Sequence, residues 1–181
     1  MTAPYTVEDL DWLKDVIGVP GRLELDPWGN LIVTPTTDEH ELAIGHMHAQ
    51  SREQLGLPPE CILTGITWRV PGGSGYYNRP DLIVLARGWQ RVGDWHLDPP
   101  PLLVVEVASR STVGIDRGRK RDDYRLGGTG LYVRVDFYDP GRAGFELYDF
   151  ATGDITVSTT AVDLVVGGRP LRFDLSDLPA G

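Results

Sequence analysis

The chain has 181 residues, enough for one domain with a sizeable core, and 41% of them are hydrophobic, as in ordinary globular proteins. Its formal net charge of −9 at pH 7 disfavours a general nucleic-acid binder, because affinity for phosphates comes mainly from Lys and Arg; a local basic patch stays compatible with this charge. The single cysteine, Cys61, excludes an internal disulfide and any zinc site made of several cysteines.

The sequence contains no segment with the roughly eighteen apolar residues of a membrane-spanning helix. Its first residues, Met-Thr-Ala-Pro, lack both the basic and the apolar region of a signal peptide. We therefore expect a cytoplasmic protein without a membrane partner.

The first third of the chain predicts two helices separated by a β-hairpin. Thr6 and Thr37 are each placed to cap the start of a helix, and Pro58 ends the second helix. A turn that contains Gly29 separates two short apolar runs. In chain order, the predicted elements are a helix over residues 6–17, strands Arg22–Leu25 and Leu31–Thr34, and a helix over residues 38–55.

The rest of the chain predicts strands interrupted by one helix, Asp116–Leu126, which ends at two glycines. The predicted strands are residues 61–70, 82–86, 102–108, 131–138, 145–150, 155–159 and 164–173. Since no linker or internal repeat divides the chain, we expect a single domain over residues 1–181. Its class is α/β or α+β, with a mixed central β-sheet flanked by helices and a C-terminal run of strands.

Glu106 stands inside a run of apolar residues, 102–108, that is typical of a buried strand. An unpaired carboxylate in such a place costs more than the net stability of a domain, so a buried Glu is normally paired, protonated or bound to a metal. Asp81 opens the apolar run 82–85, after Pro80. The two acids are therefore candidates to bind one cation, and an ion pair between Glu106 and Arg79 or Arg117 is the plainer alternative.

Several short motifs follow one another in a characteristic order. They are Leu-Glu-Leu-Asp at 23–26, Arg-Pro-Asp-Leu-Ile-Val at 79–84, Pro-Pro-Leu-Leu-Val-Val-Glu-Val-Ala-Ser at 100–109, Asp-Arg-Gly-Arg-Lys at 116–120, and Tyr124. In this order and spacing they resemble the Uma endonuclease family, which belongs to the restriction-endonuclease-like PD-(D/E)XK superfamily. The resemblance covers roughly residues 6–150. It implies a restriction-endonuclease-like fold and a metal-dependent endonuclease, with DNA favoured over RNA as the substrate.

The resemblance also implies which residues hold the metal. Asp81 and Glu106 would be the carboxylate ligands, and the carbonyl of Val107 would be a third ligand. Such hard oxygen ligands, together with waters, suit Mg²⁺ or Mn²⁺. The metal would polarise the phosphodiester and lower the pKa of an attacking water.

The signature lysine of the superfamily is missing from its usual position, which in this chain is Ala108. The resemblance offers Lys120 as a substitute, on the helix that follows the strand. We expect its amine to point toward Asp81 and Glu106 and to position the attacking water. Arg117 and Arg121, its neighbours on the same helix, are expected to contact the substrate backbone.

Three more residues are candidates for the edge of the site: Glu24, His40 and Tyr124. An outward-facing hairpin carboxylate explains Glu24 equally well, and a helix-start histidine explains His40. Packing against the core is the plainer explanation of Tyr124.

Three functions remain open on the sequence alone. The first is a Mg²⁺-dependent endonuclease, and a homodimer is compatible with it because cleavage of a duplex usually needs two active sites. The second is a non-catalytic module of the same fold that binds a partner protein or nucleic acid, which Ala108 and the acidic composition favour. The third is a structural or dimerising domain in which the buried Glu106 is only ion-paired.

Overall fold

The computed structural model describes residues 5–6, 9, 22–26, 28–34, 37–69, 77–93, 96–108, 116–136 and 144–176. For Arg22, Thr34, Asp116 and Arg117 it describes the backbone only. The helix predicted over residues 6–17 lies almost entirely outside these residues. In the described part of the chain, no helix is long and apolar enough to cross a membrane.

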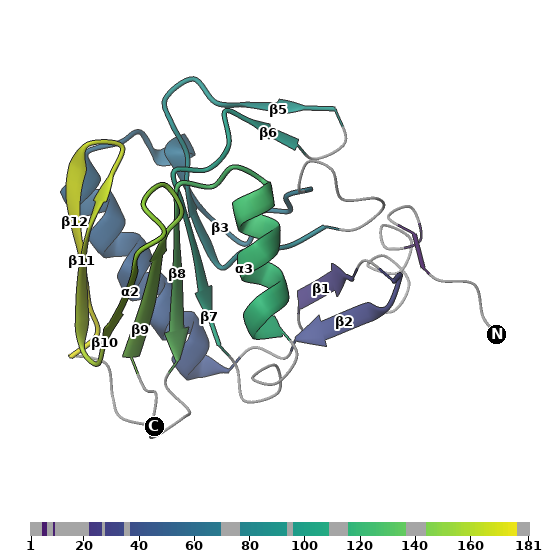
Figure 1. The fold of residues 1–181 in the computed structure, drawn as a ribbon, viewed down its shortest axis with the longest axis horizontal. Coiled ribbons are helices and arrows are strands. Elements are labelled where there is room, and N and C mark those ends of the chain that lie inside the picture. Colours follow the sequence, from purple (N-terminus) through teal and green to yellow (C-terminus); the bar gives the residue numbers. More distant parts are fainter. Residues whose placement is uncertain are drawn as a thin grey trace.

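A six-stranded mixed sheet forms the centre of the fold (Figure 1). Its strands are β3 (Ile62–Thr64), β4 (Leu82–Val84), β7 (Leu103–Val107), β8 (Leu131–Asp136), β9 (Gly144–Asp149) and β10 (Ile155–Ser158). They lie side by side in the order β10, β9, β8, β7, β4, β3, and only the neighbours β7 and β8 are parallel. Helix α3 (Asp116–Leu126) connects these two strands, because a parallel pair needs a crossover connection. The architecture agrees with the fold class predicted from the sequence.

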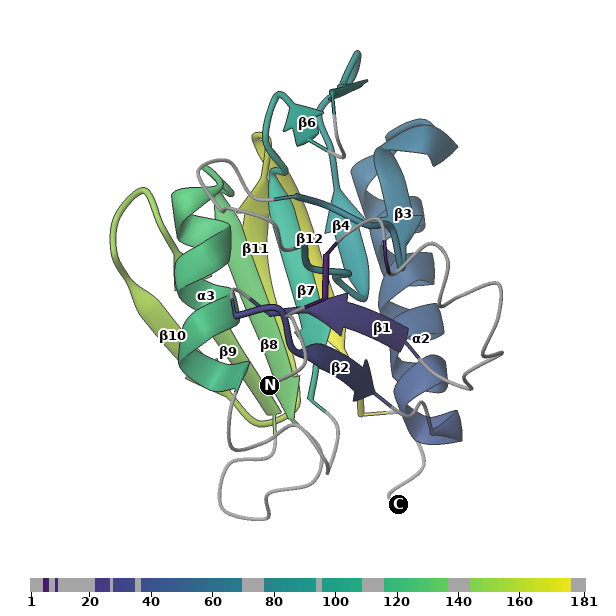
Figure 2. The same ribbon diagram turned by 90° about the vertical axis from the view of Figure 1, so that its right-hand side faces the viewer.

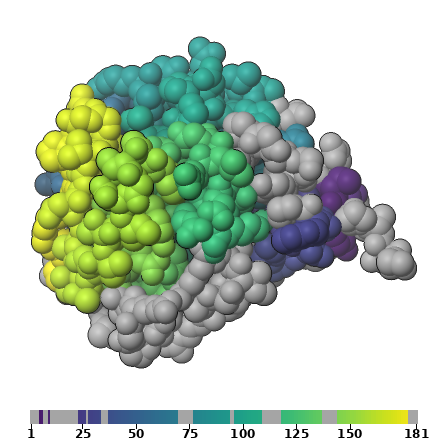
Figure 3. Space-filling view, viewed as in Figure 1, coloured from purple at the N-terminus to yellow at the C-terminus, as the bar shows by residue number. Residues whose placement is uncertain are grey.

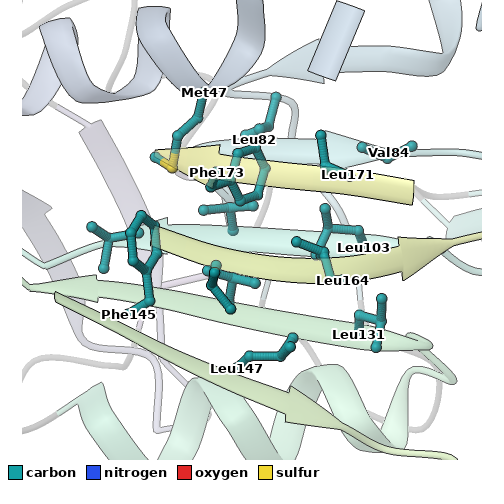
Figure 4. Packing of buried hydrophobic residues seen from close by; sticks show 14 of the residues in the cluster. Met47, Leu82, Val84, Leu103, Leu131, Phe145, Leu147, Leu164, Leu171 and Phe173 are labelled. Carbon is teal, nitrogen blue, oxygen red and sulfur yellow. The ribbon is translucent and has the colours of Figure 1, made fainter. Parts of the chain in front are cut away.

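The two faces of the sheet are covered by different elements (Figures 1 and 2). Helix α2 (Asp38–Leu55) and the hairpin of β11 (Ala161–Val166) and β12 (Arg169–Asp174) pack on one face, and α3 packs on the other. Side chains alternate along β7, so Val105 belongs to the core under α2 whereas Val104 belongs to the core under α3. Figure 4 shows the first core, in which Met47 of α2, Leu82 of β4 and Phe173 of β12 share one cluster.

Helix α2 starts where the sequence predicts it to start. The side chain of Thr37 accepts a hydrogen bond from the backbone N–H of His40 at 3.3 Å and caps the helix. At the other end, Gly56 adopts a left-handed conformation with φ of 55°, as a C-terminal cap requires. This capping fixes His40 in the first turn of α2, and its side chain is buried.

The predicted hairpin near the N-terminus is confirmed. Strands β1 (Arg22–Leu25) and β2 (Leu31–Thr34) pair antiparallel as a separate two-stranded sheet. A bridge between Leu25 and Tyr77 attaches β1 to the segment that leads into β4. The attachment buries Glu24 on the side of the central sheet that carries α3.

Two of the predicted strands were wrong in their extent. The strand predicted over residues 164–173 is a hairpin, because Gly167 and Gly168 take φ of 55° and 79° and reverse the chain between β11 and β12. The strand predicted over 61–70 is only β3, because the chain turns at Gly65 with φ of 60°. The structure also has a 3₁₀ turn, Pro59–Cys61, and a small hairpin of β5 (Gln90–Val92) and β6 (His96–Asp98). The residues of β5 are all exposed, so they lack the alternating pattern that reveals a strand.

Candidate functional site

Asp81 and Glu106 lie on the same face of the central sheet, on neighbouring strands. Strands β4 and β7 are antiparallel, with Leu82 opposite Val105. One further step of this register places Asp81 opposite Glu106, and residues that are directly opposite have Cβ atoms about 4.5–5.5 Å apart. Both carboxylates are buried, with exposed fractions of 3% and 7%. The structure thus brings together the two acids that the sequence singles out.

The Asp81 carboxylate is held by two neighbours. Its Oδ2 accepts a hydrogen bond from the backbone N–H of Val107 at 2.6 Å. The same oxygen lies 3.3 Å from Nε2 of His40, which reaches over from α2. His40, which the sequence places at the edge of the site, therefore contacts a proposed metal ligand directly.

The Glu106 carboxylate contacts two residues of helix α3. Nζ of Lys120 lies 3.3 Å from each of its oxygens, and the Tyr124 hydroxyl donates a short hydrogen bond to Oε1. Burial raises the pKa of Glu106 above its ordinary value of 4.5; the charge of Lys120 opposes this rise and the charge of Glu24 adds to it. Burial, reinforced by the charge of Glu106, also raises the pKa of Tyr124 well above its usual range, so the hydroxyl keeps its proton and remains a donor.

Lys120 also contacts Glu24, across the site from Glu106. Its Nζ lies 3.0 Å from both carboxylate oxygens of Glu24 and donates a hydrogen bond to Oε1. Oε1 of Glu24 accepts a second hydrogen bond, from the backbone N–H of Arg79, at 3.0 Å. One ammonium thus lies between two buried carboxylates, as the predicted position of Lys120 beside the acids requires.

Tyr124 is held between two aromatic rings that the sequence analysis does not connect with the site. Trp68 stacks on it with ring centroids 5.6 Å apart and an angle of 6° between the planes, and Tyr132 packs at 5.4 Å. Gly127 leaves room for Trp68, because a Cβ atom there would lie 2.6 Å from the indole ring. Beside this stack, the buried Asn78 donates a hydrogen bond to Asp123 at 3.2 Å. These contacts fix α3 over the sheet. In the sequence, their only signal is the presence of the aromatic residues, which are often found in protein cores.

The predicted basic surface of α3 is only partly described. Arg121 is bonded to Asp122, with Nε 2.9 Å from Oδ1, and its guanidinium carbon lies 5.9 Å from the centre of the Tyr148 ring over β9. The side chain of Arg117 lies outside the described part of the chain, so its predicted contact with substrate is not tested. Helix α3 is open at the surface in the space-filling view, where it is drawn in green (Figure 3).

A buried ion cluster that the sequence analysis did not predict lies next to the site on β8. Arg134 stands opposite Glu106 in the parallel register, but its guanidinium binds Asp136 at 2.5 Å and Glu146 at 3.0 Å. Among the described side chains, the cation that contacts Glu106 is Lys120 and not an arginine. The alternative of an arginine partner at Arg79 is wrong, since its side chain donates to the carbonyl of Gly65 instead.

The donor set is compatible with a magnesium-like cation that keeps several of its waters. Asp81 and Glu106 supply two carboxylates, and with Glu24 the site holds three buried acids beside one lysine. Mg²⁺ is commonly bound through one or two carboxylates with water in the remaining positions. Within the described residues, no group of three or more His, Cys, Asp and Glu side chains is arranged to hold a metal ion. The described residues therefore do not form a metal site in which protein side chains supply all the ligands.

Comparison with known proteins gives one family and one solved structure of note. The model of the Uma2 family, described as "Putative restriction endonuclease", matches residues 8–161. A crystal structure from Anabaena variabilis, titled as a putative nuclease belonging to DUF820, is similar to this chain with a TM-score of 0.56 and 13% identity. The similarity covers 85% of this chain and 84% of that one, and at this identity it shows a shared fold. No curated protein matches the chain.

Proposed function

Because the chain belongs to the Uma2 family, we propose that it is a nuclease whose Asp81 and Glu106 bind a divalent cation for the hydrolysis of nucleic-acid phosphodiester bonds. The observation that supports this most strongly is the position of Lys120, with its ammonium 3.3 Å from the Glu106 carboxylate, although the usual lysine position is Ala108. A lysine that replaces the missing one has to reach the same carboxylate from another element. Lys120 does so from α3.

The residues that would hold the cation are Asp81, Glu106 and the carbonyl of Val107, and the cation would be Mg²⁺ or Mn²⁺. When bound, it polarises the phosphodiester and makes a bound water more acidic. Asp81 is oriented for this role by the N–H of Val107 and by His40, and Glu106 by Tyr124. The acids are thus held in place before the cation arrives, which reduces the ordering cost of binding.

Lys120 has a different role in this proposal. Its protonated Nζ donates hydrogen bonds, so it orients a water or a phosphoryl oxygen close to Glu106 and offsets the negative charge that develops during hydrolysis. His40 and Tyr124 act on the acids and not on the substrate. Ala108 leaves the strand without an amine, so Lys120 is the residue on which this step depends.

We propose DNA as the substrate in preference to RNA, with Arg117 and Arg121 at its backbone. Both belong to α3, which also contains Arg119 and Arg125 in a chain of net charge −9. Phosphate contacts of this kind position a nucleic acid without reading its sequence. Substituting Arg121 should therefore weaken binding to all sequences alike.

We also propose a domain organisation, a location and an oligomeric state for the protein. Residues 1–181 form a single domain, located in the cytoplasm, and two copies associate as a homodimer that cuts both strands of a duplex. Limited proteolysis tests the first of these, and sedimentation velocity tests the last. A compact fragment released by protease would contradict the single domain, and a sedimenting mass near 20.0 kDa at all concentrations would contradict the homodimer.

A nuclease assay tests the central function. The wild-type protein and its Asp81→Asn variant are incubated with double-stranded DNA, single-stranded DNA and RNA, in Mg²⁺, in Mn²⁺ and in EDTA. We expect cleavage of DNA by the wild-type protein in either metal and none in EDTA or by the variant. Metal-independent nucleic-acid binding without cleavage would favour the non-catalytic module instead.

A further inference from the structure

Glu24 is the third buried acid of the site, and it stands apart from the other two. Asp81 and Glu106 are neighbours across β4 and β7, whereas Glu24 belongs to β1 of the separate N-terminal hairpin. Its exposed fraction is 3%. We propose that Glu24 is a positioning residue that holds the Lys120 ammonium, and that it is not a ligand of the divalent cation; this inference rests on the proposed function.

Both oxygens of Glu24 lie close to the Lys120 ammonium, as an anchor for lysine requires; Oε1 accepts hydrogen bonds, and Oε2 takes part in the ion pair without a hydrogen bond from the described residues. Oε1 accepts from Lys120 and from the backbone N–H of Arg79, each at 3.0 Å, and Oε2 lies 3.0 Å from Lys120 as well. To bind a cation at about 2.1 Å, Glu24 would have to give up the lysine at one or both of these oxygens. Glu106 also contacts Lys120 through both oxygens, but at the longer distance of 3.3 Å.

The distances around Lys120 indicate which contact yields when a cation binds. Its Nζ is 3.0 Å from Glu24 but 3.3 Å from Glu106. A cation on Glu106 repels the ammonium and competes for the same oxygens, so the longer contact is the one that opens. Glu24 then keeps Lys120 within reach of the site. Without Glu24 the buried ammonium would lose its closer counter-ion, which is strongly unfavourable, and would leave the site or close onto Glu106.

The burial of β1 explains why Glu24 can act in this way. Its neighbours in sequence, Leu23 and Leu25, are both buried, and the bridge from Leu25 to Tyr77 fixes the strand beside the segment that leads to Asp81. The backbone N–H of Arg79 then orients the carboxylate of Glu24. An acid fixed from two sides positions a long lysine side chain more accurately than solvent would.

Terbium luminescence separates an anchor from a ligand. Tb³⁺ replaces the divalent cation. The luminescence lifetimes of the bound Tb³⁺ in H₂O and in D₂O give the number of water molecules bound to it. Loss of a carboxylate ligand admits about one further water, since the cation fills the vacant position. We expect Glu24→Gln to bind Tb³⁺ with the same number of waters as the wild-type protein, and Asp81→Asn, the matched control, to gain about one or lose binding.

Kinetics test whether Glu24 acts through Lys120. We expect Glu24→Gln and Lys120→Met each to lower kcat by about a hundredfold or more with little change in KM, in the range of general acid–base contributions. The double variant should be no slower than the slower single variant, because the two residues act as a unit. Glu53→Gln, at an exposed position of α2, controls for the change in net charge and should leave kcat unchanged.

The outcomes distinguish this inference from the function on which it rests. If the wild-type protein neither cleaves nor binds Tb³⁺, the proposed function fails. If the wild-type protein does both but Glu24→Gln gains a bound water, Glu24 is a ligand and the inference is wrong. If the water count is unchanged but the rate losses of Glu24→Gln and Lys120→Met multiply in the double variant, Glu24 acts independently of Lys120 and the inference is also wrong.

Discussion

Lys120 on α3 reaches Glu106 on β7, with its Nζ 3.3 Å from both carboxylate oxygens. Helix α3 belongs to the crossover connection between the parallel strands β7 and β8. The contact between Lys120 and Glu106 therefore depends on how α3 packs on the sheet, and not on local sequence. This contact supports the interpretation that the lysine of the site has moved from the strand to the helix.

Replacing Lys120 by Met tests this interpretation with little change in side-chain volume. We expect cleavage to fall by about a hundredfold or more, because the ammonium that orients water or phosphate is lost. The melting temperature should still rise on addition of Mg²⁺, because Asp81 and Glu106 remain. Arg52→Met, at an exposed position of α2, is the control and should retain cleavage. Full activity of Lys120→Met would show that the site does not use this lysine.

Divalent cations should stabilise the folded protein through Asp81 and Glu106. A cation that binds only the native state adds about 2.7 kcal/mol to the free energy of unfolding at a hundred times its Kd. We expect Mg²⁺ and Mn²⁺ to raise the melting temperature of the wild-type protein but not that of Asp81→Asn. Equal midpoints for the wild-type protein with and without millimolar metal would count against the site.

The ionised form of Glu106 should lower stability when no metal is present. Its pKa in the folded state is raised, so between about 4.5 and that raised value the folded protein binds more protons than the unfolded one and its stability falls as pH rises. Glu106→Gln removes this dependence. We therefore expect the melting temperature of Glu106→Gln, relative to wild type in EDTA, to increase from pH 4 to pH 8. A constant or decreasing difference would mean that folding does not raise the pKa of Glu106.

The packing of Trp68 against α3 can be tested with two glycines of the same region. Gly127→Ala would place a Cβ atom 2.6 Å from the Trp68 ring, so we expect a loss of about 1–3 kcal/mol in the free energy of unfolding. Gly118→Ala is the matched control, since nothing lies within 4 Å of its added Cβ and it should be neutral or stabilising by up to about 1 kcal/mol. Denaturant unfolding measures both. Equal stabilities of the two variants would contradict the close contact.

The pairing of Asp81 with Glu106 follows from features that a sequence displays. Each acid interrupts or opens an apolar run, and such runs predict buried strands. The resemblance to the Uma family then singles out these two acids as metal ligands. The capping of α2 by Thr37 and the hairpin around Gly29 are local in the same sense, and both are confirmed.

Other parts of the site depend on contacts between distant elements. That Glu24 would turn inward to Lys120, 96 residues away, depends on how the β1–β2 hairpin docks, and a strand of four residues gives no sign of this. The stacking of Trp68 on Tyr124 and the ion pairs of Arg134 with Asp136 and Glu146 likewise depend on how the elements pack together, so the sequence does not reveal them. The hairpin of β11 and β12 differs from the single predicted strand because Gly167 and Gly168 turn the chain between two apolar runs, each of which has the pattern of a strand.

The position of a bound Mn²⁺ ion tests the central claim most directly. A crystal grown with Mn²⁺ gives an anomalous difference peak at the metal, independent of any assumption about activity. We predict a peak within about 2.0–2.4 Å of carboxylate oxygens from both Asp81 and Glu106, with waters in the remaining positions and Lys120 still bound to Glu24. A peak elsewhere in a protein that cleaves DNA, or no peak at these acids at saturating Mn²⁺, would contradict the account.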